Sequence, residues 1–210
     1  MQKIETKRKN KILLALGISI IIICVVICTL LALYNSSIKT EEEKKINHFL
    51  EIQEEVQNDN FKKINKSTTK QDQETYIAVI EIPKISLKKG LYRLESKLNN
   101  VDKNIQILKG SEYPNIDNSN FILAGHSGTG RNAFFNNIHK LKNNDIVYVF
   151  FNGKKYTYEV KCIYDIKKTG TAKIIRDKGV KTVTLITCKG DNQQTIIIAN
   201  LLKEELLNNG

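Results

Sequence analysis

Residues 12–34 form a strongly apolar run of 23 residues that contains no charged side chain. At about 1.5 Å of rise per residue, a helix of this length crosses a hydrocarbon core of roughly 30 Å. A cleaved signal peptide is the alternative, but its apolar region spans about 7 to 15 residues, and 35–37 lack a small-x-small cleavage pattern. The sequence therefore predicts an uncleaved transmembrane helix over 12–34.

Basic residues dominate the segment before this run. Residues 1–11 hold five Lys or Arg side chains against the single acidic Glu5. Because basic flanks stay on the cytoplasmic side of a membrane, 1–11 are expected to form a cytoplasmic tail. The prediction is a single-pass protein of the cell membrane whose N-terminus is cytoplasmic and whose remaining chain is extracellular.

Composition divides the chain beyond the apolar run. Thr40, followed by the acidic residues 41–43, is typical of a capped helix start. A thin apolar stripe and then a polar stretch follow, so 35–74 are predicted to form a helical stalk and a polar linker. The folded domain is expected over 75–206, and 207–210 form a C-terminal tail.

Charge and cysteine usage exclude several function classes. Of the formal net charge of +11, residues 35–210 carry +7, from 28 of the 33 basic and 21 of the 22 acidic side chains, spread over the segment without a nucleic-acid-binding motif. Solvated surface charge is the favoured interpretation, and anionic lipid or wall polymer is a better candidate partner than nucleic acid. Cys24 and Cys28 lie in the apolar run, which leaves Cys162 and Cys188 and gives no disulfide framework. The three histidines are scattered, so we predict no metal site and no cofactor.

Short β-branched segments dominate the predicted folded domain. An Asn-Gly pair at 152–153 is a strong hairpin signal, and short helices are expected at 132–141 and as a turn at 99–104. The predicted strands cover 76–82, 120–125, 145–151, 155–164, 182–188 and 195–202. Six or more short strands separated by turn signals predict a mainly β fold with a closed or nearly closed barrel.

Two residues have the character of a thiol nucleophile and its base. Cys188 ends a predicted strand and precedes a loop signal at 189–192, which favours an exposed thiol over a buried one. His126 follows another strand and is surrounded by small residues that clear space for the imidazole. Taken singly, each residue is more often structural. Together they predict a cysteine nucleophile paired with a histidine.

These segments also resemble a known family. The residues TLITC at 184–188 resemble the TLxTC signature of sortases, and LAGHS at 123–127 resembles the segment that carries the sortase histidine. The resemblance covers about 75–205 and implies an eight-stranded β-barrel with short helices. It implies a cysteine transpeptidase that cleaves an LPxTG-like sorting signal through a thioacyl intermediate on Cys188, with His126 as acid and base. The acceptor would be an amine of a cell-wall precursor or a pilin lysine.

The chain departs from the sortase pattern after the cysteine. Sortases carry an arginine on the following strand, but no arginine follows Cys188 here, and Gln194 or Thr195 stands at that position. Loss of one oxyanion donor costs on the order of 100-fold to 1000-fold. We consider Arg176 as a substitute cation, with a solvated surface charge as the alternative.

The resemblance further implies that the connection 167–179 forms a wall of the sorting-signal groove, with an ordinary surface loop as the alternative. The expected groove residues are Thr171, Ala172, Ile174, Ile175 and Thr187. Calcium binding by scattered acidic loop residues is an alternative that the sequence leaves undecided. Two functional hypotheses follow: an active membrane-anchored transpeptidase, or a sortase-like peptide- or wall-binding protein whose catalysis is impaired because the arginine is absent.

Overall fold

The N-terminal segment is helical. The computed structural model describes residues 2–58 and 75–207, and the first of these segments is one continuous helix, α1 (Gln2–Asn58). Among the described residues, one stretch of α1, Leu16–Glu54, is long and apolar enough to cross a membrane. This is consistent with the predicted anchor. Met1, the linker residues 59–74 and the tail residues 208–210 lie outside the described residues.

Helix α1 continues through Thr40, where a second helix was expected to begin. The Thr40 hydroxyl donates to the carbonyl oxygen of Ser36 at 2.9 Å, and the Ser37 hydroxyl donates to that of Leu33 at 3.0 Å. A hydroxyl bonded to the preceding turn caps no free N–H group. The expected helix start is therefore wrong, because glutamates after Thr40 also suit a helix interior.

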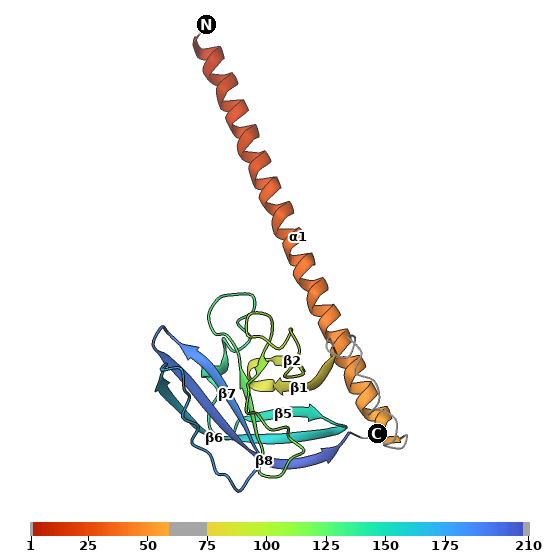
Figure 1. Cartoon of the computed structure of the whole chain (residues 1–210). Coiled ribbons are helices and arrows are strands. Elements are labelled where there is room, and N and C mark those ends of the chain that lie inside the picture. The colour runs from red at the N-terminus through yellow and green to blue at the C-terminus, as the bar shows by residue number, and fades with distance from the viewer. Residues whose placement is uncertain (1, 59–74, 208–210) are drawn as a thin grey trace. The chain divides into compact units, whose positions relative to one another are not determined.

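The residues after the linker form one eight-stranded sheet with the order β2-β1-β5-β6-β8-β7-β4-β3 (Figure 1). The strands are β1 (Tyr76–Ile82), β2 (Leu87–Tyr92), β3 (Gln106–Ile107), β4 (Asn120–Ala124), β5 (Ile146–Phe151), β6 (Lys154–Lys167), β7 (Thr182–Lys189) and β8 (Gln193–Leu206). The side chain of Asn104, just before β3, donates to the carbonyl oxygen of Gly90 in β2 at 2.8 Å. This bond links the two edges of the sheet, and the predicted eight-stranded, nearly closed barrel is confirmed.

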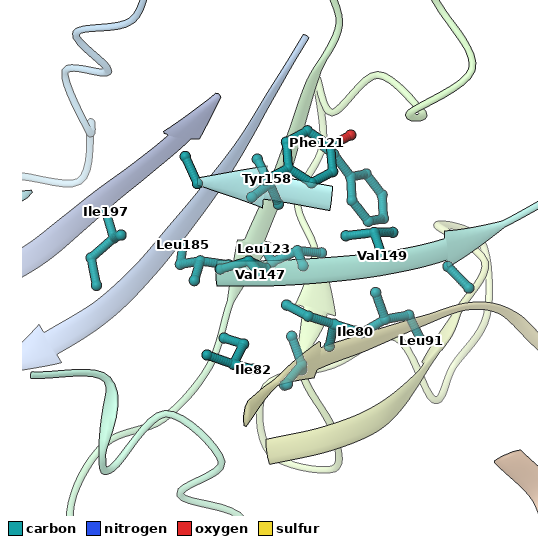
Figure 2. Close-up of a cluster of buried hydrophobic side chains, with 14 of the residues drawn as sticks. Ile80, Ile82, Leu91, Phe121, Leu123, Val147, Val149, Tyr158, Leu185 and Ile197 are labelled. Carbon is teal, nitrogen blue, oxygen red and sulfur yellow. The ribbon is translucent and has the colours of Figure 1, made fainter. Parts of the chain in front are cut away.

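Alternation along the strands separates two apolar clusters. Val183 and Leu185 of β7 face the barrel interior together with Ile197 of β8. Figure 2 shows side chains of β1, β4, β5, β7 and β8 meeting in this core, among them Ile80, Leu123 and Val147. The alternate residues of the same two strands face the other way. Ile186 of β7 and Ile196 and Ile198 of β8 form a second cluster on the other face of the β7–β8 pair. Burial of each large aliphatic side chain contributes about 1.5–3 kcal/mol.

The C-terminal part of α1 belongs to the barrel. The chain divides into two compact units, Met1–Lys45 and Ile46–Gly210. Within the second unit, Ile46 and Phe49 pack on Val79 of β1, which is fully buried. The side-chain oxygen of Gln53 accepts a hydrogen bond from the Gly153 amide at 2.6 Å. The folded unit therefore begins within the predicted stalk rather than at residue 75.

The hairpin predicted at 152–153 is confirmed. Asn152 and Gly153 have φ angles of 49° and 72°, and Phe151 of β5 pairs with Lys154 of β6 across the turn. Two left-handed residues are what a type I′ turn requires, which is why an Asn-Gly pair is favoured there. The turn sets the register in which the two strands pair.

The helix expected over 132–141 is wrong. Within that segment the only helical structure is a 3-10 turn, η3 (Ile138–Lys140), comparable to η2 (Pro83–Ile85) after β1. The amide of Phe135 donates to the carbonyl oxygen of His126 at 2.9 Å, and the Asn136 side chain accepts from Gly128 at 3.2 Å. These bonds tie the segment to the residues around His126 in place of a helical ladder.

Candidate active site

The parallel pairing of β4 with β7 brings His126 and Cys188 to the same level of the sheet. Ala124 pairs with Ile186, and each of the two predicted residues lies two positions further along its own chain. The Gly125 amide continues the ladder by donating to the carbonyl oxygen of Ile186 at 3.1 Å. Because neighbouring strands lie about 4.8 Å apart, equal steps past a paired position keep the two residues adjacent.

Two hydroxyl groups join the histidine segment to the cysteine strand. Thr187 donates to the carbonyl oxygen of Gly125 at 2.8 Å, and Ser127 donates to the carbonyl oxygen of Cys188 at 2.5 Å. These bonds flank His126 on both sides and hold its backbone to β7. The structure buries Thr187, at 5% exposure, so this predicted groove residue faces the histidine segment.

Glycines allow the tight path around His126. A Cβ atom on Gly125 would lie 2.8 Å from the ring of Phe135, which is fully buried. Gly128 has a φ of 112°, a conformation that side-chain-bearing residues rarely adopt. The glycines next to His126 are therefore required for steric reasons.

The imidazole of His126 contacts a carboxylate that sequence reasoning missed. Its Nε2 atom lies 3.0 Å from Oδ1 of Asp102, and the two side chains are 43% and 77% exposed. Asp102 precedes the histidine by 24 positions and lies in a polar loop between β2 and β3. No motif or periodicity marks this residue, so only the fold identifies it.

The register of β8 distinguishes the two residues considered for the arginine position. Gln194 pairs directly with Cys188 and shares a face with Ile196 and Ile198. Thr195 lies on the other face, pairs with Thr187, and donates to Oδ1 of Asp165 at 2.8 Å. The structure brings Gln194, and not Thr195, alongside the thiol.

The Asp165 carboxylate binds two side chains close to Cys188, those of Lys189 and Thr195. Its pKa lies below its usual range because the Lys189 ammonium donates to it, with a further hydrogen bond from Thr195. Lys189 follows the cysteine directly, and its ammonium is held by this carboxylate. The ion pair therefore fixes the start of the turn between β7 and β8.

The structure does not bring Arg176 to the thiol. Its guanidinium donates to the carbonyl oxygens of Asn118, Asp177 and Val180 at 3.0, 3.1 and 3.3 Å. Asn118 precedes β4 and Val180 precedes β7, so these partners lie at the beginning of the two parallel strands. Cys188 lies at the other end of β7.

The connection between β6 and β7 lies against the second apolar cluster. Ala172 and Ile174 pack on it, whereas Thr171 and Ile175 are exposed. The hydroxyl of Tyr164 donates to the carbonyl oxygen of Lys173 at 2.9 Å and accepts from the Ile175 amide at 2.8 Å. Burial raises the pKa of Tyr164, so its hydroxyl keeps the proton that it donates. One side chain thus holds this connection to the sheet.

Comparison with known proteins identifies the fold and the family. The family model for the sortase domain matches residues 80–202. Sortase A of Bacillus anthracis is 26% identical over 167 residues, which cover 77% of this chain and 74% of the relative. Sortase A of Staphylococcus aureus (strain NCTC 8325 / PS 47) is 24% identical over 191 residues, which cover 90% and 92%.

Solved structures agree with this assignment. The sortase D5 transpeptidase of Clostridium perfringens superimposes with a TM-score of 0.55 at 25% identity, over 78% of this chain and 95% of that one. Sortase A of Listeria monocytogenes has the same fold, with a TM-score of 0.53 at 21% identity, over 62% and 90%. The chain belongs to the sortase family, a family of cell-wall transpeptidases.

Proposed function

We propose that this sortase is a membrane-anchored cysteine transpeptidase in which Cys188 is the nucleophile and His126 the acid and base. The observation that supports the proposal is the parallel register of β4 and β7, in which each of these residues follows the paired Ala124 or Ile186 by two positions. The Gln194 amide, opposite the cysteine, is a hydrogen-bond donor for the oxyanion that forms during attack. The substrate is a sorting signal of the LPxTG type on a surface protein.

The proposed reaction has two halves. The Cys188 thiolate attacks the carbonyl carbon of the threonine, the C–N bond to glycine breaks, and the His126 imidazolium gives its proton to the departing amine. A thioacyl enzyme results. An amine of a wall precursor or a pilin then attacks the thioester, the C–S bond breaks, and the neutral imidazole takes the proton that the amine loses. Thiolate and imidazolium are restored.

In our proposal the chemistry takes place outside the cell, which the basic residues at the N-terminal end of α1 support. Residues 1–11 remain cytoplasmic, and the barrel faces the wall, where surface proteins and their acceptors meet. Wall anchoring requires this sidedness.

Trapping the intermediate tests the function. The full chain in detergent micelles is incubated with a panel of LPxTG-type peptides without an acceptor, and intact-protein mass spectrometry is followed by peptide mapping. We expect a mass increase equal to the acyl fragment on Cys188, which disappears when hydroxylamine is added. Peptide binding without any adduct across the panel would contradict the enzyme and support the alternative, a sortase-like binding protein with impaired catalysis.

Tyr164→Phe is expected to weaken substrate binding more than chemistry. The variant keeps the aromatic ring and loses both hydrogen bonds to the β6–β7 connection, each worth about 0.5–1.5 kcal/mol. In the proposed function this connection is a wall of the peptide groove, so KM rises about tenfold while kcat stays within about twofold. Steady-state kinetics with one peptide measure both constants.

Tyr148→Phe is the matched control. Tyr148 lies on β5, and the Lys155 Nζ atom lies 4.1 Å from the centroid of its ring. Removal of the Tyr148 hydroxyl therefore leaves the β6–β7 connection unchanged. The KM of this variant should equal that of the native chain. An unchanged KM in Tyr164→Phe would show that the hydroxyl has no part in substrate binding.

A further inference from the structure

The contact between His126 and Asp102 has no role in the reaction as written above. The carboxylate reaches the imidazole from a loop between β2 and β3, whereas His126 follows β4. Asp102 binds Nε2, which leaves Nδ1 as the ring nitrogen not engaged by this carboxylate. The two nitrogens of a histidine are thus chemically distinct here.

The loop holds Asp102 in a defined position. The Asp102 amide donates to the side-chain oxygen of Asn100 at 2.9 Å, and the Asn104 amide donates to the carbonyl oxygen of Asn100 at 2.8 Å. The buried side chain of Asn104 fastens this turn to Gly90 of β2. The carboxylate therefore extends from a turn that is anchored to the barrel.

A second hydrogen bond joins the same two segments. The side-chain amide of Asn132 donates to the carbonyl oxygen of Asp102 at 2.5 Å. Asn132 lies in the segment that begins with His126, so backbone and side chain of Asp102 both bond to it. The Asn132 bond holds the Asp102 backbone, and the His126 contact holds its carboxylate. Together the two bonds restrict rotation of the imidazole more than either bond alone.

We propose that Asp102 is a positioning residue that fixes the orientation and the tautomer of His126. A carboxylate accepts hydrogen bonds, so the neutral ring carries its proton on Nε2, and the lone pair lies on Nδ1. Both proton transfers of the reaction then occur at Nδ1: the imidazolium releases its Nδ1 proton to the departing amine, and the neutral ring takes the acceptor's proton there. This assignment rests on the proposed function.

The contribution of Asp102 to catalysis is modest, because the side chains of Asp102 and His126 are both partly exposed to solvent. Water competes for the carboxylate, and exposed charged pairs contribute little free energy. We expect Asp102→Ala to lower kcat about fivefold with KM unchanged, because the carboxylate touches the histidine and not the peptide. Asp102→Asn keeps an oxygen acceptor at the same place and should stay within about twofold of the native kcat.

Nuclear magnetic resonance tests the assignment without relying on activity. The full chain in micelles is labelled with ¹⁵N-histidine, and the signal of His126 among the three histidines is identified from its loss in His126→Gln. In the alkaline range, where imidazole rings are neutral, the native chain should show protonated Nε2 and unprotonated Nδ1. In Asp102→Ala the two nitrogen shifts should move toward each other as a second tautomer becomes populated.

Asp117→Ala is the matched control. Asp117 is an exposed carboxylate before β4, and it forms an ion pair at 3.7 Å with Lys181, which directly precedes β7. This variant should leave both the nitrogen shifts and kcat unchanged. The proposal requires both effects in Asp102→Ala. A native ring protonated on Nδ1, unchanged nitrogen shifts, or an unchanged kcat would each overturn it. A native chain without any thioacyl adduct would instead refute the proposed function, and the nitrogen shifts would still report on the tautomer.

Discussion

Cys188→Ala is expected to abolish transpeptidation, with a loss on the order of 10⁶-fold, as when the nucleophile of a comparable covalent mechanism is removed. Without the thiolate no thioacyl enzyme forms, and cleavage would need direct attack by water or amine. The measurement is chromatography of the ligated product from an LPxTG-type peptide and an amine acceptor, with the full chain in micelles. The hydroxylamine-sensitive adduct should vanish in parallel.

Cys162→Ala provides an internal control for this experiment. Cys162 carries the same thiol, lies on β6, which pairs with β8, and packs on the apolar cluster that contains Ile196. Its removal deletes one sulfur atom from a partly buried site and leaves β7 unchanged. Native activity is expected. Turnover that survives Cys188→Ala, or that disappears in Cys162→Ala, would contradict the assignment of the nucleophile.

The second large effect is expected at Gln194. Because its side chain lies opposite Cys188 on the same face, Gln194→Ala removes the proposed oxyanion donor and should lower kcat about 100-fold. Gln194→Arg keeps a donor and adds charge, and charge-assisted hydrogen bonds are roughly twice as strong as neutral ones. This variant should exceed the native kcat about tenfold. Single-turnover rates of thioacyl formation measure both changes.

Gln193→Ala is the control for both variants. Gln193 precedes Gln194 in β8, is exposed, and pairs with Lys189 instead of Cys188. Successive residues of a strand face opposite sides, so its amide points away from the thiol. If Gln193→Ala and Gln194→Ala slow the reaction equally, the effect comes from the strand end and not from an oxyanion donor.

The strands that sequence reasoning found are those with a clear apolar or β-branched signal. β1 was predicted at its observed bounds, and β7 differs by one residue at its end. β2 was missed because its sequence, LKKGLY, carries two adjacent lysines and a glycine, which is typical of an exposed edge. β3 has two residues, too few for any periodicity.

The site was predictable only where a residue belonged to a motif. His126 and Cys188 were predicted from their local sequences, and the strand register puts each of them two positions beyond the paired Ala124 and Ile186. The choice between Gln194 and Thr195 depends on which face each residue occupies, and a shift of one position reverses that face. Asp102 reaches the histidine through a loop whose path depends on the Asn104 contact with β2. No local sequence signal encodes such a contact.

The packing of Ile46 and Phe49 on Val79 affects how this enzyme can be prepared as a soluble fragment. The change in composition near residue 75 suggests a cut after the linker, but a fragment cut there uncovers the apolar face of β1 that α1 shields. Exposed apolar patches of this kind promote self-association. A fragment that begins at residue 46 retains the shielding turns and the Gln53 contact with the β5–β6 hairpin. The apolar run of residues 12–34 and the first residue of the hydrophobic core, Ile46, are thus separate parts of one helix.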